Sequence, residues 1–300
     1  MITRTYPEEP HRISGNTLVH LNAAGEFTAT HISPLSIRST MKGVEKHNTK
    51  NSGYTVTPEK FLILNCGCEC ESTIESEPES LAVFFGREFA EGALSSIITP
   101  GDKMLNNSFV HPAQPVTFFE KTYPHNHTIS PVLMKLRFAS RIDFNDNDFI
   151  NENCYFLLEG LMKLHRDLYN EITKLPPVKL STKTELYRRI CMAKEFIDDC
   201  YTEKIRLEDI AKHACLSQFH FLRVFRTIFG QTPHQYVLGK RMTKALDLLR
   251  RSEMPVTQVC YEIGLESPGS FSRMFRIRFG ISPESFREQH NSFLYTFRML

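Results

Sequence analysis

The sequence contains one short unit twice, and this repeat constrains the fold more than any other feature. The first copy runs from Leu207 to Tyr236 and the second from Val256 to Phe286. Upstream residues match at an offset of 49, so the second copy has one extra residue in its turn. Such a repeat predicts one supersecondary unit used twice. The residues that recur unchanged at an offset of 50 are Phe221, Arg223, Phe225, Arg226, Phe229, Gly230 and Pro233.

Each copy is predicted to form two helices joined by a tight turn. In the first copy, apolar residues recur at helical spacing over Leu207–Ala214 and again over Phe221–Ile228. Ser217 is placed to cap the second helix, Gly230 to end it, and Pro233 to begin another. This pattern predicts a helix-turn-helix, whose second helix can enter the major groove of DNA.

The outward face of the predicted second helix carries Phe219, Leu222, Arg223 and Arg226. Arginine can form two hydrogen bonds with guanine, and apolar groups can contact the methyl group of thymine. A solvated face with two stray apolar residues is the alternative interpretation. The aligned arginines of the second copy favour DNA binding.

Further residues of this region recur at the spacing of one protein family. They are Leu216, Ser217, His220, Phe221, Arg223, Phe225, Gly230, Pro233, Tyr236, Arg241, Ala245, Leu249, Ile263, Gly264, Phe271, Arg273, Phe275, Gly280, Ser282, Pro283, Phe286 and Arg287. With them, residues 185–287 resemble the DNA-binding domain of the AraC/XylS family of bacterial transcription regulators. The resemblance covers about a third of the chain. It implies seven helices, with Pro233–Arg251 as a rigid connector and both recognition helices on one side of the DNA, in successive major grooves.

The sequence departs from the family pattern at two places. The second turn has Gly264, whereas the first has Cys215 at the matching position, so we expect the first turn to keep a negative φ. The second recognition helix begins Pro268-Gly269-Ser270, where family members often have longer polar side chains. We therefore hypothesise that the first unit reads base sequence, whereas the second mostly contacts phosphates and reads DNA shape. The expected DNA-contacting residues are Gln218, Phe219, Leu222, Arg223, Arg226, Ser270, Arg273 and Arg276.

Charge is unevenly distributed along the 300 residues, whose net charge is only +2. From Lys183 onward there are 19 Lys and Arg against 13 Asp and Glu, and before it 17 against 21. The balance is therefore +6 in the C-terminal part and −4 in the N-terminal part. A basic C-terminal part fits contact with nucleic acid, although the repeat is the stronger indication.

The N-terminal part is predicted to be rich in β-strands, with one short helix over Arg87–Ile98. The pattern of residues 54–65 resembles the cupin-like sensory domain that many members of the family carry. The predicted fold class is therefore α+β and multidomain, with a β-rich cupin-like barrel over residues 1–150. The short apolar runs predicted as strands are Leu35–Met41, Phe61–Leu64, Leu81–Phe85, Val116–Phe119 and Val132–Phe138.

Two groups of residues in this part could be mistaken for metal sites. Cys66, Cys68 and Cys70 would lie on one face of a strand, but their spacing is unusual for zinc, and a metal- or redox-sensing role is the less favoured alternative. His125 and His127 resemble half of a cupin metal motif whose following glutamate is missing here. We expect no metal and no cofactor, whereas an unidentified small-molecule effector could bind inside the barrel.

A helix is predicted over residues 151–175, because apolar residues follow 4-3 spacing from Cys154 to Leu175. This stripe fits either a helix that pairs with a second copy in a homodimer or a helix that packs on its own barrel. We interpret His165, which lies within it, as a packed histidine. Residues 176–183 form the predicted linker, stiffened by two prolines. The DNA-binding domain spans residues 184–290, with helix-turn-helix units at about 205–230 and 254–280.

Together these features predict a sequence-specific transcription regulator of the bacterial cytoplasm. The expected partners are double-stranded DNA at promoters, RNA polymerase as the family implies, and a second copy of the chain. No apolar run is long enough to span a membrane. A cupin-like metal-dependent enzyme or small-molecule-binding protein fused to a DNA-binding module is the alternative. We expect no enzyme, because no paired catalytic carboxylates, nucleophile elbow or phosphate loop are recognisable. The operator, the effector and the choice between activation and repression are not encoded in recognisable form.

Overall fold

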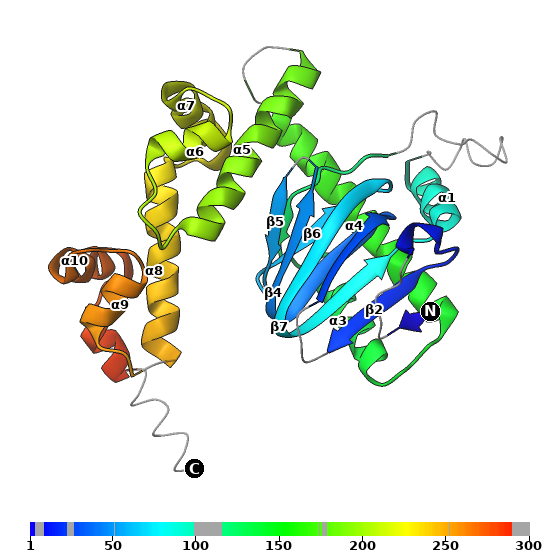
Figure 1. Ribbon diagram of the computed structural model, residues 1–300, viewed down its shortest axis with the longest axis horizontal. Helices are drawn as coiled ribbons and strands as arrows, with labels where there is room; N and C mark the ends of the chain where they lie inside the picture. Colours follow the sequence, from blue (N-terminus) through cyan, green and yellow to red (C-terminus); the bar gives the residue numbers. More distant parts are fainter. Residues whose placement is uncertain are drawn as a thin grey trace, which may run out of the picture. The chain divides into compact units, whose positions relative to one another are not determined.

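The computed structural model describes residues 1–3, 9–22, 27–50, 52–98, 116–173, 175, 179–251 and 253–289. The chain divides into two compact units, Met1–Lys174 and Leu175–Leu300 (Figure 1). The first unit contains the β-sheet with its helices, and the described part of the second is helical. This confirms the predicted α+β multidomain class. None of the described helices is long and apolar enough to cross a membrane.

The first unit is built on one sheet in which eight strands are described. Its hydrogen-bonded path is β1-β2-β7-β4-β6-β8, with β3 also pairing with β7 and β5 with β4. The two longest strands, β4 and β7, pair from Ser36 opposite Phe84 to Thr49 opposite Cys70, with register shifts between Thr40 and Val44. Such irregularities bend a strand, which lets one sheet curve around its core. The strands are β1 (Ile2–Thr3), β2 (Thr17–Asn22), β3 (Phe27–Ser33), β4 (Ser36–Thr49), β5 (Gly53–Val56), β6 (Lys60–Leu64), β7 (Cys68–Phe84) and β8 (Thr122–Pro124).

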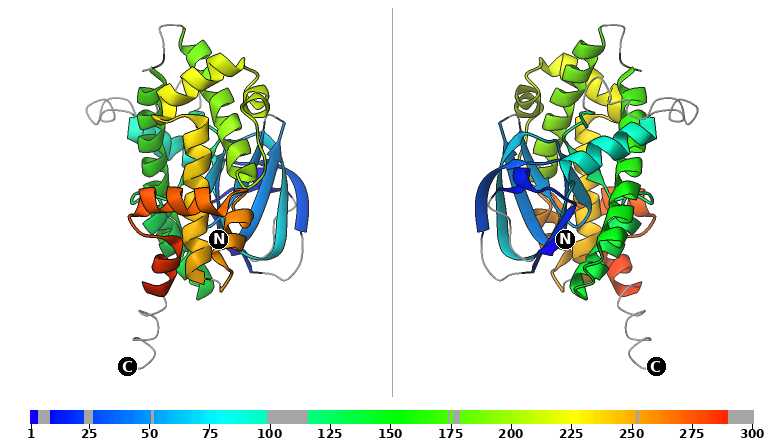
Figure 2. Two further views of the ribbon diagram at one scale, coloured as in Figure 1. Left: turned by 90° about the vertical axis from the view of Figure 1, so that its left-hand side faces the viewer. Right: turned by 90° about the vertical axis from the view of Figure 1, so that its right-hand side faces the viewer.

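Three α-helices and one 3-10 helix complete the described part of the first unit: α1 (Arg87–Ile98), α3 (Ser130–Arg141), α4 (Asn147–Thr173) and η1 (Pro10–Arg12). Helices α3 and α4 lie together on one side of the sheet (Figure 2). Gly160 permits a close approach there, because a Cβ atom at this position would lie 2.5 Å from the side chain of Ile129. The helix predicted over Arg87–Ile98 is confirmed.

Two of the predicted strands are wrong. Residues 132–138 belong to helix α3, in which Leu133, Leu136 and Ala139 are buried at helical rather than alternating spacing. Residues 116–120 form no strand, and the backbone N–H and C=O of Phe118 are both paired with the side chain of Asn65, at 2.8 Å each. A side chain thus replaces the expected neighbouring strand.

The three N-terminal cysteines do not share one strand face, contrary to the prediction. Cys66 lies in the turn before β7 and is exposed, whereas Cys68 is half-buried and Cys70 is buried. Burial raises the pKa of the Cys68 thiol to about 12, so this thiol stays protonated at neutral pH. Among the described residues, no group of three His, Cys, Asp or Glu side chains could hold a metal ion.

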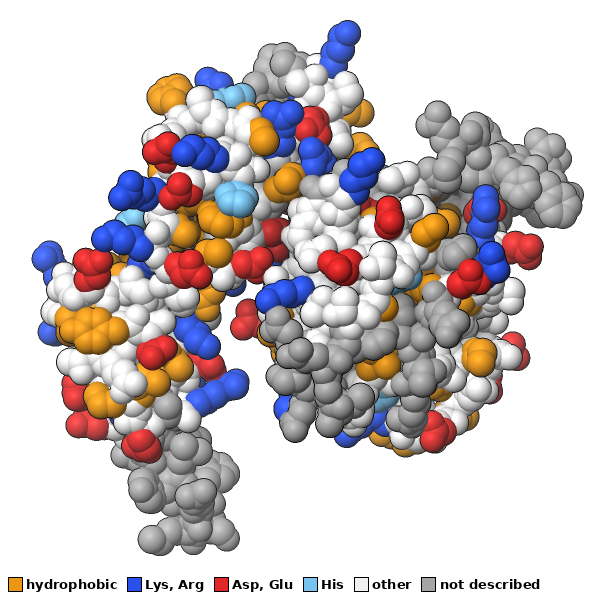
Figure 3. Space-filling view, in the orientation of Figure 1, with side chains coloured by type: hydrophobic (Ala, Val, Ile, Leu, Met, Phe, Trp, Pro, Cys, Tyr) orange, Lys and Arg blue, Asp and Glu red, His pale blue; other side chains and the backbone are white. Residues whose placement is uncertain are grey.

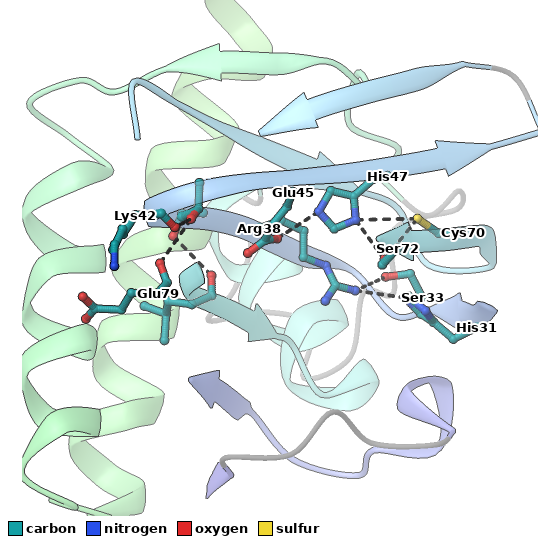
Figure 4. A network of polar contacts seen from close by, with 12 residues as sticks. His31, Ser33, Arg38, Lys42, Glu45, His47, Cys70, Ser72 and Glu79 are labelled. Atoms are coloured by element: carbon teal, nitrogen blue, oxygen red, sulfur yellow. Dashed lines mark hydrogen bonds and ion pairs between the residues drawn. The ribbon is translucent and has the colours of Figure 1, made fainter. Parts of the chain in front are cut away.

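Buried polar side chains occupy the interior of the first unit (Figure 4). The guanidinium group of Arg38, which is buried, lies 3.2 Å from His31 Nε2 and donates to Ser33 Oγ at 3.3 Å. His47 Nε2 lies 3.1 Å from Glu45 Oε2. Burial lowers the pKa of His47, although Glu45 opposes the shift. These side chains form a polar interior that the sequence alone does not predict.

The apolar stripe of α4 is buried within the chain. Cys154, Leu158 and Leu161 have no exposed surface, and Leu168 and Ile172 are also buried. His165 packs edge-on against Phe118, with ring centres 5.6 Å apart. The burial of these side chains fits the alternative in which the helix packs on its own domain.

The second unit contains seven described helices, as the family resemblance implies. They are α5 (Leu180–Cys200), α6 (Leu207–His213), α7 (Gln218–Phe229), α8 (Pro233–Arg251), α9 (Val256–Glu262), α10 (Pro268–Phe279) and a last helix over residues 283–289. Of the predicted linker, residues 176–178, which include both prolines, lie outside the described residues.

Candidate nucleic-acid interface

The two helix-turn-helix units are closed by the same hydrogen bonds. In the first turn, Leu216 N–H donates to Ala211 O at 3.0 Å, and in the second, Leu265 N–H donates to Cys260 O at 3.0 Å. Ser217 and Ser267 then cap the recognition helices α7 and α10, each accepting a backbone N–H with its hydroxyl oxygen. The sequence repeat is therefore a structural repeat at the level of individual bonds.

The buried aromatic rings also repeat. The Phe221 and Phe225 ring centres are 5.4 Å apart, and those of Phe271 and Phe275 are 5.7 Å apart. All four rings are fully buried. Glycines in the left-handed conformation end both recognition helices, Gly230 with φ 68° and Gly280 with φ 82°. These contacts fix which face of each helix points outward.

In the turn of the first helix-turn-helix unit, the predicted negative φ is wrong. Cys215 has φ 50°, not the expected negative value. Its N–H donates to Lys212 O, as Gly264 N–H donates to Tyr261 O, both at 2.9 Å, so the closed turn imposes the left-handed conformation in both units. At Gly264, φ is 77° and a Cβ atom would lie 2.0 Å from Thr202 O. The Cys215 side chain is exposed, so this turn can hold a side chain at the cost of backbone strain.

Helix α5 is held to α8 by a charged cluster around Asp198. The Tyr236 hydroxyl donates to Asp198 Oδ1 at 2.8 Å, and Lys194 Nζ donates to Oδ2 at 2.7 Å. Burial alone would lower the pKa of Lys194, but the Asp198 carboxylate outweighs it and the pKa is raised. Arg241 of α8 donates to the carbonyls of Tyr201 and Glu203, at 2.6 and 2.7 Å. These bonds stiffen the connector between the two units.

All eight predicted DNA-contacting residues are exposed, and they lie on the two recognition helices. Phe219 is 78% exposed, an unusual value for so large an apolar side chain. Figure 3 shows Lys and Arg side chains spread over the helical unit, with apolar side chains between them. The residues are Gln218, Phe219, Leu222, Arg223 and Arg226 on α7, and Ser270, Arg273 and Arg276 on α10.

The arginines of these helices differ from others of the same unit. Within the described part of the chain, none of Arg223, Arg226, Arg273 and Arg276 forms an ion pair. By contrast, Arg188 and Arg189 share Glu185, and Arg251 pairs with Asp247 at 2.7 Å. These four exposed guanidinium groups, which pair with none of the described carboxylates, are available to phosphates and base edges.

Ile277 also lies on this surface, although it is not among the predicted DNA-contacting residues. Ile277 lies on α10 four positions after Arg273, which places the two side chains on neighbouring parts of one helix face. It is 74% exposed. It aligns with Thr227 of the first unit at the offset of 50, and this alignment could have identified it. The second helix therefore presents an apolar group as well as its arginines.

The sequence matches known regulators over this region. Residues 210–289 match the model of a family described as "Helix-turn-helix domain". The probable transcriptional regulator LumQ of Photobacterium leiognathi is 36% identical over 142 residues, which are 47% of this chain and 53% of LumQ. The regulatory protein SoxS of Salmonella typhimurium is 30% identical over 95 residues, which are 32% of this chain and 89% of SoxS. The chain thus spans about half the length of LumQ.

One solved structure that is similar to part of the chain is a DNA-binding domain. It is the DNA-binding domain of AdpA, a global transcriptional factor, in complex with a target DNA. It is 27% identical, with a TM-score of 0.34, and the match covers 35% of this chain and 94% of that domain.

Proposed function

Because the chain belongs to the AraC/XylS family of transcription regulators, we propose that it binds double-stranded DNA at promoters through both helix-turn-helix units. One observation carries the proposal: two helices with the same buried framework present exposed arginines that form no ion pair with any described residue. The two helices enter successive major grooves, which recur about every 34 Å along the duplex.

The two recognition helices have different tasks in this proposal. Helix α7 reads base sequence, with Arg223 on guanine and with Phe219 and Leu222 against thymine methyl groups. Gln218 and Arg226 complete its contact surface. Helix α10, through Ser270, Arg273 and Arg276, contacts mainly phosphates and responds to DNA shape.

The remaining parts of the chain regulate this binding. Residues 1–150 are the sensory domain, 151–175 its C-terminal helix, 176–183 the linker and 184–290 the DNA-binding domain. The effector, a small molecule, binds in the polar interior of the sensory domain. The buried Oε1 of Glu45 supports this, because it has no hydrogen-bond partner among the described residues.

The protein functions as a homodimer in the bacterial cytoplasm, where it changes the recruitment of RNA polymerase. It acts through binding and not as an enzyme.

A gel shift on the DNA that flanks the protein's own coding region tests the function. We expect the chain to bind this DNA more tightly than unrelated DNA, and the double variant Arg223→Ala, Arg273→Ala to lose the preference. Arg251→Ala is the matched control, because Arg251 is an exposed arginine already paired with Asp247. Equal loss of binding in the control would contradict the assignment of the recognition helices. Footprinting then locates the two half-sites.

A further inference from the structure

A groove lies between the two helix-turn-helix units, along the connector helix α8 (Figure 1). It consists of two adjoining hollows with volumes of about 300 and 330 Å³. Ile205, Leu265 and Met274 line both hollows and therefore mark the part that they share. Ligand pockets in proteins have volumes of about 300–1,000 Å³, so the groove is large enough for a small organic molecule.

The walls of the groove are mainly apolar and remain partly open to solvent. Ile205, Leu265 and Met274 are half-buried, whereas Ile210 and Val237, which line the larger apolar part, are buried. The backbone bond from Leu265 N–H to Cys260 O holds one wall in place. An apolar molecule that enters such a preformed groove removes these surfaces from water without first ordering them.

One cation in the groove has no carboxylate partner among the described residues. Arg241 of α8 lines both hollows and is half-buried. It donates through Nε to Tyr201 O and through Nη2 to Glu203 O, so its guanidinium group is held in place by neutral carbonyls. Burial lowers the pKa of Arg241, because its charge is partly withdrawn from water. A carboxylate bound at Nη1 would offset this cost.

The other charged side chains of the groove leave this positive charge in place. Lys204 and Glu266 are both exposed and pair with each other at 3.3 Å, so their charges balance. His234 is exposed at the edge of the apolar hollow. The groove therefore combines an apolar wall with the positive charge of Arg241, which complements an apolar molecule that carries one carboxylate.

We propose that this groove binds a small organic acid. Its apolar body lies against Ile205, Leu265 and Met274, and its carboxylate pairs with Arg241. This site lies wholly within the helical unit, so it is separate from the effector site of the sensory domain.

The bound acid opposes DNA binding. Leu222 of α7 and Ser270 of α10 also line the groove, so its occupant reaches both recognition helices. A negative charge at this place repels the phosphates of a bound duplex, and the acid covers part of the Leu222 side chain. The opposition is reciprocal, because two ligands that share a linkage change each other's affinity by the same factor. This effect rests on the proposed DNA binding, whereas the binding of the acid does not.

Isothermal titration calorimetry of the full chain with 2-naphthoate tests the site. This probe has an apolar ring system and one carboxylate. We expect Ile205→Trp to weaken its binding by about tenfold or more, because the larger side chain fills the part shared by both hollows. Tyr261→Trp is the matched control, since Tyr261 is 59% exposed in the same helical unit and lines neither hollow. Far-ultraviolet circular dichroism verifies that each variant is folded.

The neutral analogue 2-naphthylmethanol tests the charge without changing Arg241, whose bonds to Tyr201 and Glu203 also support the fold. We expect it to bind about tenfold more weakly than 2-naphthoate or worse, because it cannot form the charged pair. Equal binding of the two probes would overturn the role of Arg241. Absence of saturable 2-naphthoate binding, or binding that Ile205→Trp leaves unchanged, would overturn the site.

Gel shifts with and without saturating 2-naphthoate test the effect on DNA. We expect the acid to lower the DNA affinity of the unmodified chain and of Tyr261→Trp by about fivefold or more, and to leave that of Ile205→Trp unchanged. An acid that binds the groove without changing DNA affinity would overturn the opposition. A chain that binds no DNA even without the acid would overturn the proposed function instead, and the calorimetry would still decide whether the groove binds the acid.

Discussion

The two helix-turn-helix units share a framework but not a surface. Their buried phenylalanines align in the sequence, and the distance between the two ring centres is 5.4 Å in the first unit and 5.7 Å in the second. Their outward faces differ, since Phe219 and Leu222 of the first unit align with Gly269 and Ser272 of the second.

The difference shows which positions the fold constrains. Buried rings and turn bonds must repeat for each pair of helices to pack. Outward positions carry no such requirement, so the surface can diverge with the task of each unit.

The largest expected effect tests the shared framework. Phe225→Ala and Phe275→Ala should each destabilise their own unit by about 3–5 kcal/mol, because both remove a fully buried ring. Hydrogen exchange of the full chain, read separately over α6–α7 and α9–α10, measures the two effects. If the two substitutions reduce the stability of their units by amounts that differ several-fold, the two cores are not equivalent.

Two glycines with positive φ in the second helix-turn-helix unit should respond unequally to substitution by alanine. Gly264→Ala should destabilise the second unit by about 2–3 kcal/mol, because φ is 77° and the new Cβ would overlap Thr202 O. Gly280→Ala is the control, with a similar φ of 82° but no atom of the described residues within 4 Å of the new atom. If hydrogen exchange over α9–α10 shows equal losses for both, the overlap with Thr202 is unimportant and backbone strain alone decides.

The helical unit was predictable because its signals are local and occur twice. Helical spacing of the phenylalanines, a serine cap and a terminal glycine each act within one turn of helix. The φ of Cys215 was not predictable, because hydrogen bonds of the closed turn impose it whatever the residue type. The exposure of Ile277 was also not predicted, because its residue type alone suggests a buried position.

The β-rich unit was predictable only in part. A short apolar run such as Val132–Phe138 fits a strand or a buried helix equally well, and here the helix formed. The polar interior depends on residues that lie far apart in sequence, such as His47 and Ser72, which strand pairing places opposite each other. Polar residues in a strand otherwise suggest a solvent-facing side.

The surfaces should differ in specificity. Arg223→Ala should cost about 1–3 kcal/mol at the specific site and relax the preference at one base pair. Arg276→Ala should weaken binding to all DNA alike and reduce its salt dependence. Gel shifts with the specific site and with unrelated DNA, at several salt concentrations, separate the two outcomes. An Arg223→Ala chain that keeps its full site preference would refute the reading role of α7.

The smallest expected effect tests the strain in the first turn. Cys215→Gly should stabilise the first helix-turn-helix unit by about 0.5–1 kcal/mol, because glycine adopts φ 50° without steric cost. This gain exceeds the additional chain entropy that glycine loses on folding. Cys215→Ala is the control, since it removes the thiol but keeps the Cβ atom that causes the strain. Hydrogen exchange over α6–α7 should therefore slow in the glycine variant and stay unchanged in the alanine variant. Equal slowing in both would assign the effect to the thiol, and the two turns would then differ in side-chain chemistry and not in backbone strain.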